Sequence, residues 1–163
     1  MSDKARFERH ALNLGKLTGN LQTIEMAARL AIVKLDKAAG ERVQAQLPQV
    51  RVGDLVESNA FTNKDDLNQT LEKYNKRAPL VCRVDRKVIV ALRDGLAHGR
   101  VFGVGTMKHL RLLKFSRKAT DGRVAVELAI DMTDEWFQEN IRLLNEAVAK
   151  ITSALDYEIR EFS

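Results

Sequence analysis

A seven-residue repeat of apolar side chains near the N-terminus constrains the fold of this chain most strongly. The repeating residues are Phe7, Leu14, Leu21, Ala28 and Leu35, each followed three positions later by an apolar residue (Leu17, Ile24, Ala31, Ala38). This spacing predicts one amphipathic helix from about residue 5 to 39, about 50 Å long at 1.5 Å per residue. Its stripe is typical of a helical bundle or a coiled coil. His10 occupies a seam-like position, so we interpret it as structural.

Three further helices are predicted from apolar spacing and from capping residues. One begins near Thr62-Asn63, has acids in its first turn and ends before Pro79. The next runs from an N-cap at Asp85 to Gly99, with apolar residues at 84, 88, 92 and 96. The last begins at the capping residue Thr133 and continues a bundle seam to residue 162. The stretch 41–63 is difficult to interpret and could hold a short helix.

Two segments between the third and fourth helices alternate apolar and polar residues as strands do. Residues 108–115 and 124–130 flank Asp121-Gly122, a strong hairpin-turn signal. The glycines of residues 100–105 predict a loop, which lacks the lysine and hydroxyl residues of a phosphate-binding loop. We therefore expect an all-α fold, an up-down four-helix bundle forming one domain over residues 1–163, with a β-hairpin inserted at about 108–131.

Composition is that of a globular protein without a membrane span. Hydrophobic residues make up 45% and charged residues 30% of the 163 residues. No apolar run approaches the ~18 residues of a membrane helix, and residues 1–10 lack the apolar segment of a cleavable signal. We expect a cytoplasmic location. Cys82 is the single cysteine, which excludes a disulfide within one chain and predicts a small core residue.

Positive charge is concentrated in one part of the chain. Residues 83–123 contain 11 Lys/Arg against three Asp, a net charge of +8, whereas the other residues carry a net charge of −3. Such a distribution indicates a phosphate backbone as partner, and a solvated basic face is the alternative. The predicted RNA-binding residues are Arg100, Lys108, Arg111, Lys114 and Arg117.

The predicted third helix carries the strongest candidates for chemistry near its end. Asp94 and His98 are four residues apart on one face, so the carboxylate is expected to orient the imidazole. Arg93 lies roughly 140° around the helix from His98, at ~100° per residue. The two side chains can converge only if the helix frays at a glycine or if a second subunit contributes. The spacing therefore predicts a composite site in a homodimer.

Arg93-Asp94-Gly95-Leu96-Ala97-His98 resembles the arginine-polar-x3-histidine motif of the HEPN superfamily, which also carries it near the end of a helix in a small helical domain. The residue after the arginine is most often asparagine in that family, and aspartate is a tolerated replacement. One subgroup has a tyrosine two residues after the histidine, as a target for nucleotide addition by its antitoxin. This chain has Arg100 there, so that regulation is not carried over.

The resemblance implies a metal-independent endoribonuclease, a toxin or phage-defence effector with an antitoxin or defence-system partner. Attack by a ribose 2′-hydroxyl needs a base, an acid and a cation for the phosphorane charge, and histidine and arginine supply these groups. Arg93, Asp94 and His98 are the catalytic candidates. No metal site and no cofactor are expected. The alternative is a non-catalytic bundle of HEPN type that binds RNA or a partner protein, since fold alone does not establish an activity.

Overall fold

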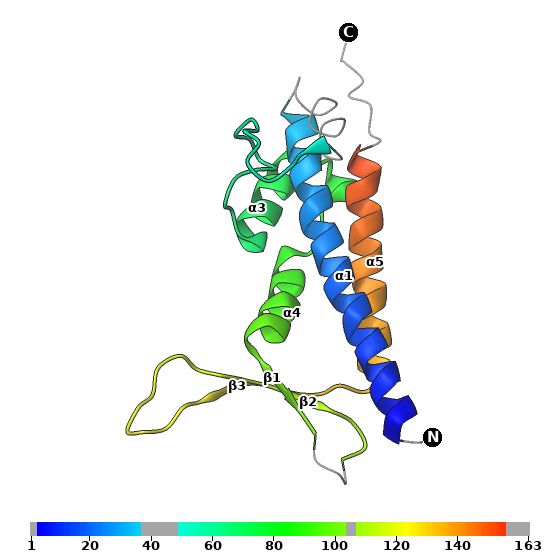
Figure 1. Cartoon of the computed structure of the whole chain (residues 1–163), viewed down its shortest axis with the longest axis vertical. Coiled ribbons are helices and arrows are strands. Elements are labelled where there is room, and N and C mark those ends of the chain that lie inside the picture. The colour runs from blue at the N-terminus through cyan, green and yellow to red at the C-terminus, as the bar shows by residue number, and fades with distance from the viewer. Residues whose placement is uncertain (1–2, 37–48, 104–106, 156–163) are drawn as a thin grey trace. The chain divides into compact units, whose positions relative to one another are not determined.

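The computed structural model describes residues 3–36, 49–103 and 107–155. Within these residues the fold is mostly helical α+β, with four α-helices and a three-stranded antiparallel sheet between the last two of them (Figure 1). The four expected helices and a β insertion between the third and the fourth are confirmed. The expected all-α class is corrected to α+β, because the insertion is a sheet of three strands that begins at Arg100 and not a hairpin at about 108–131. None of the described helices is long and apolar enough to cross a membrane.

Helix α1 (Asp3–Leu35) is the long helix that the seven-residue repeat predicts. Its apolar stripe is buried from Leu17 through Ile24 to Ala31. The first residue of the repeat is not buried, since Phe7 is 67% exposed. The predicted end of this helix, at residues 37–39, lies outside the described residues.

The chain divides into two compact units, of which one comprises residues 20–86 and the chain from 144 onward. Its buried apolar side chains come from α1, α3 (Leu67–Arg77), the 3-10 helix η2 (Leu80–Cys82) and α5 (Asp134–Leu155). Cys82 is buried, as predicted. The buried hydroxyl of Tyr74 donates a hydrogen bond of 2.9 Å to the Cys82 carbonyl, and burial raises the pKa of this phenol.

Helix α3 begins later than the sequence pattern predicts. Its N-cap is Asp66, whose side chain accepts from the Gln69 backbone while the Gln69 side chain accepts from the Asp66 backbone, a capping box. Asn63 does not cap this helix. Its side-chain oxygen accepts hydrogen bonds from the Asp65 backbone and from Arg29. The helix ends at Arg77, and Ala78 is extended, as expected before Pro79.

Arg29 ties the loop before α3 to α1. Its side chain is only 11% exposed and pairs with Glu25 of the same helix. It also donates to the carbonyl oxygens of Ala60, Asn63 and Asp65. The Arg29 guanidinium thus donates hydrogen bonds to several carbonyl oxygens of residues 60–65, which form neither a helix nor a strand.

The other unit comprises residues 1–19 and 87–143. Helix α4 (Arg86–His98) leads into strands β1 (Arg100–Phe102), β2 (Arg111–Phe115) and β3 (Val126–Asp131), in the order β1-β2-β3. Strand β1 corrects the expected loop at 100–105, because its three residues pair with Arg111–Leu113. The predicted turn is confirmed: Asp121 and Gly122 have φ angles of 51° and 72°, which match a tight hairpin.

The sheet packs against one face of α4, and glycine makes this approach possible. A Cβ on Gly95 would lie 3.1 Å from Leu128, and one on Gly99 would lie 2.5 Å from Leu112. The buried residues of α4 are Ile89 and Gly95. The predicted stripe at 84, 88, 92 and 96 is wrong at Val88, which is 40% exposed.

Helix α5 starts as the sequence predicts. The Thr133 hydroxyl accepts a hydrogen bond from the Trp136 backbone, and Asp134 and Glu135 occupy the first turn. Trp136 packs edge-on against Phe137, with ring centroids 5.0 Å apart. Trp136 therefore contributes packing at the start of α5.

Candidate functional site

The end of α4 holds the three predicted catalytic residues. The helix remains closed through Gly95, because the Gly99 backbone N–H donates to the Gly95 carbonyl at 2.8 Å. A side chain at Gly99 would place its Cβ 2.3 Å from that carbonyl oxygen, so the residue after His98 has to be glycine in this backbone geometry. The helix therefore does not fray at Gly95, and the described residues show none of the fraying at a glycine that would let Arg93 and His98 converge.

Asp94 binds a different partner from the one that its spacing suggests. Its carboxylate accepts a hydrogen bond of 2.9 Å from the guanidinium of Arg93, and both side chains are 39% exposed. The expected pair between Asp94 and His98 is absent from the described residues. Asp94 is therefore placed to position the arginine, and a guanidinium held at one edge keeps its other N–H donors available for a phosphate.

The imidazole of His98 is exposed at the last residue of α4. It makes no hydrogen bond or ion pair with any residue of the part of the chain that the structure describes. In an unbroken helix, Arg93 remains roughly 140° around the axis from His98. One chain thus presents the two groups in different directions and does not bring them to one small target.

The five predicted RNA-binding residues differ in how far acids neutralise them. Arg111 pairs with Asp131 at 3.4 Å and Lys114 with Glu127 at 3.5 Å, both across the β2–β3 pair. The other three are exposed and form no ion pair among the described residues: Arg100 at the start of β1, Lys108 in the loop before β2, and Arg117 after β2. These three therefore have more charge available for a phosphate backbone.

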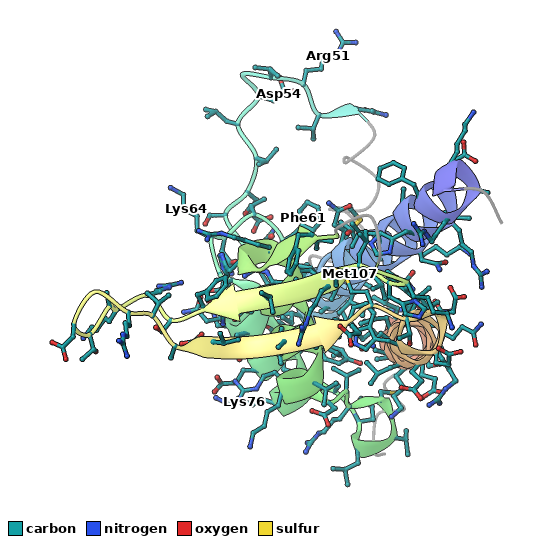
Figure 2. All side chains as sticks on the ribbon, turned by 90° about the horizontal axis from the view of Figure 1, so that it is seen from below. Arg51, Asp54, Phe61, Lys64, Lys76 and Met107 are labelled. Atoms are coloured by element: carbon teal, nitrogen blue, oxygen red, sulfur yellow. The ribbon has the colours of Figure 1, made fainter. Side chains whose placement is uncertain are left out.

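The sheet adds aromatic side chains that the sequence analysis did not select. Strand register places Arg100 opposite Leu113 and Phe102 opposite Arg111, so these side chains share the face turned away from Leu112 and α4. Phe115 lies on the same face, with the Arg100 guanidinium 5.7 Å from its ring centroid, a cation–π distance. Figure 1 shows the strands at the lower end of α4, and Figure 2 views them from below.

This sheet face combines phenylalanine rings with a guanidinium group. Phe102 is 42% exposed and Phe115 is half-buried, and Val126, which pairs with Phe115, is 56% exposed. Exposed aromatic rings can stack with bases, and the adjacent guanidinium of Arg100 can pair with phosphate. Two-residue alternation at Arg100 and Phe102 was the available signal, but the neighbouring glycines concealed the strand.

The described residues contain no group of three or more His, Cys, Asp or Glu side chains that could hold a metal ion. No protein-family model matches the chain, and comparisons with curated proteins and with solved structures found no match either. The resemblance to the HEPN superfamily thus depends on the motif at Arg93 to His98 and on the helical content.

Proposed function

We propose that this chain is a metal-independent endoribonuclease with its active site at the end of α4, built on the up-down four-helix bundle of HEPN proteins. Its place is the cytoplasm, as a toxin or phage-defence effector with an antitoxin or defence-system partner. The observation that carries the proposal is the unpaired, exposed imidazole of His98. Only Gly99 separates this imidazole from Arg100, the first residue of the basic and aromatic sheet.

The reaction uses the substrate's own 2′-hydroxyl as nucleophile. His98 of one copy removes the proton of that hydroxyl, and the 2′-oxygen forms a bond to phosphorus. The bond from phosphorus to the 5′-oxygen breaks, and His98 of the second copy protonates this leaving oxygen. Arg93, positioned by Asp94, stabilises the charge of the phosphorane. The products are a 2′,3′-cyclic phosphate and a 5′-hydroxyl.

The two histidines come from two copies because the chain offers a single one at this helix end. Two-fold pairing is the commonest assembly of identical chains. A dimer in which the ends of both α4 helices meet would bring Arg93 of one copy toward His98 of the other. The proposal therefore includes a homodimer whose active site neither chain completes alone.

The first test compares an RNA oligonucleotide with its fully 2′-O-methylated counterpart in the presence of EDTA. We expect cleavage of the RNA only, because methylation blocks the nucleophile, and we expect DNA of the same sequence to resist. The products should carry the cyclic phosphate, which mass spectrometry identifies. Cleavage that persists unchanged in His98→Ala, or equal cleavage of both oligonucleotides, contradicts the proposed mechanism.

A non-catalytic RNA-binding module is the second candidate, and the sheet face favours it. This function needs only the phosphate contacts and the aromatic platform formed by Arg100, Phe102 and Phe115. It does not need Arg93 and His98 to act on one phosphate. RNA binding without cleavage in the first test would support this module.

Both candidates predict that RNA affinity depends on salt through the unpaired cations of the sheet. The double variant Arg100→Gln/Arg117→Gln should weaken binding and reduce the slope of log K against log salt by about 0.7 per lost phosphate contact. The matched double variant Arg111→Gln/Lys114→Gln should change the slope less, because Asp131 and Glu127 already pair with these cations. Fluorescence anisotropy at several salt concentrations measures both slopes. If neither slope changes, RNA binds elsewhere.

A further inference from the structure

The β2–β3 hairpin continues beyond its strands as an ordered segment, residues 116–125, which we call the hairpin tip. The Ser116 backbone N–H donates to the Ala125 carbonyl at 2.9 Å, and the Ser116 hydroxyl accepts from the Ala125 backbone N–H at 3.0 Å. Nearer the turn, Thr120 and Arg123 exchange backbone hydrogen bonds of 2.8 and 3.0 Å. These bonds give the hairpin tip a defined conformation from the strands to the turn.

The hairpin tip is exposed on all sides. Every residue from 117 to 125 is exposed, and Ser116 is half-buried where the strands end. Figures 1 and 2 both show the tip, in yellow, extending away from the sheet with no other described segment of its unit beside it. The side chains of the tip are therefore accessible to a partner.

The hairpin tip carries positive charge that no acid compensates. Arg117, Lys118 and Arg123 form no ion pair in the part of the chain that the structure describes. Asp121, in the turn, is the one acid of residues 116–125, so the tip has a net charge of +2. By contrast, both basic residues of β2 pair with acids of β3. The charge available to a polyanion therefore lies at the tip and not along the strands.

The hairpin tip differs from the sheet face because it lacks aromatic side chains. The sheet face offers Phe102 and Phe115 for base stacking, whereas residues 116–125 contain no Phe, Tyr, Trp or His. Stacking on aromatic rings is characteristic of single-strand recognition. A double-stranded RNA is bound mainly through its phosphates and 2′-hydroxyls. Cations and the exposed Thr120 hydroxyl, without aromatic rings, therefore suit the backbone of a duplex.

The distribution of the cations also fits a duplex. Arg117 and Lys118 precede the turn and Arg123 follows it, so both strands of the ribbon carry positive charge. The phosphates of a duplex lie in two rows that border its grooves, and a ribbon with cations on both strands can contact both rows. At ~3.3 Å per residue, the turn is up to ~20 Å from Phe115. A duplex at the tip and a single strand on the sheet face can therefore belong to one RNA.

We infer that the hairpin tip binds the backbone of a double-stranded RNA segment, so that the preferred RNA has a stem next to a single-stranded segment. The inference rests on the proposed RNA binding at the sheet face, which both candidate functions share, and it does not depend on cleavage. It adds Lys118 and Arg123 to the RNA-binding residues. The sequence analysis had selected Arg117 alone from the tip.

Two RNAs test the inference by fluorescence anisotropy: a single strand, and the same strand extended by a stem of about ten base pairs, one helical turn. The single-stranded segment is 2′-O-methylated in both, so that the proposed cleavage cannot occur. We expect the stem to strengthen binding at least about tenfold at ~50 mM salt, and we expect this gain to shrink as salt rises.

The double variant Lys118→Gln/Arg123→Gln should remove most of the gain from the stem. It should also lower the slope of log K against log salt for the stem RNA by about 0.9 per lost phosphate contact. Binding of the single strand should change less than about twofold, because the sheet face is intact. The matched double variant Lys16→Gln/Lys64→Gln removes two exposed cations outside the tip and should keep the gain. Circular dichroism confirms that each variant is folded.

The possible failures are distinguishable. A stem that adds no affinity, or a gain that persists in Lys118→Gln/Arg123→Gln, would overturn the inference and leave the proposed function standing. An equal loss for the single strand would also overturn it, because the tip would then attract any RNA. No binding of either RNA would overturn the proposed function as well. A polyglutamate peptide that binds as tightly as the stem RNA, and weakens as much in the variant, would assign the tip to an acidic protein instead.

Discussion

Arg93→Ala should slow RNA cleavage by about 10²–10³-fold in kcat, the usual effect of removing one group that stabilises transition-state charge. Arg93→Lys should be strongly impaired as well. Lysine is a point charge, and it cannot both bind the Asp94 carboxylate and present a second pair of donors to the phosphorane. Single-turnover rate constants at saturating enzyme measure the chemical step for each variant.

Arg100→Ala is the control for this series. Its guanidinium lies over Phe115 in the sheet, so we expect weaker RNA binding and a nearly unchanged rate at saturation. Near-normal turnover in Arg93→Lys would show that a point charge suffices. An equal loss of rate in Arg93→Ala and Arg100→Ala would mean that Arg93 contributes only to backbone attraction.

A tethered dimer with one unchanged chain and one His98→Ala chain tests whether two copies share the site. If one histidine acts as base and the other as acid, this hybrid should be nearly inactive, because every composite site lacks one of them. Two independent sites would leave about half of the activity. A hybrid with half of the turnover would rule out the composite site, even in a dimeric ribonuclease.

Arg29→Ala should lower the free energy of unfolding by about 1–3 kcal/mol, the range for leaving buried hydrogen-bond acceptors without their donor. The Arg29 side chain is 11% exposed. Its loss leaves the carbonyl oxygens of Ala60, Asn63 and Asp65 without this donor and releases the segment before α3. Urea denaturation followed by circular dichroism gives the difference.

Two further variants make the stability result specific. Arg29→Lys keeps the charge but replaces several directed donors by one ammonium group, so it should recover only part of the loss. Arg77→Ala removes an exposed ion pair with Asp36 and should cost less than about 1 kcal/mol. A loss in Arg29→Ala no larger than in Arg77→Ala would show that the loop is held by other contacts.

Local chemistry made the helices, the turn and their ends predictable. The seven-residue repeat located α1, Pro79 marked the end of α3, Thr133 marked the start of α5, and Asp121-Gly122 marked the hairpin turn. Each of these signals acts within a few residues of itself, through side-chain periodicity, a missing N–H, a cap or a positive φ angle. None of them requires knowledge of a distant partner.

Tertiary structure decided the features on which function depends. Strand β1 exists because β2 is available to pair with it, and the buried face of α4 was set by the approach of Leu112 and Leu128 to its glycines. Asp94 could reach either Arg93 or His98 by spacing, and the structure pairs it with the arginine. Sequence determined the elements of this protein because their causes are local, whereas its binding surfaces arise from contacts between residues far apart, which no local pattern records.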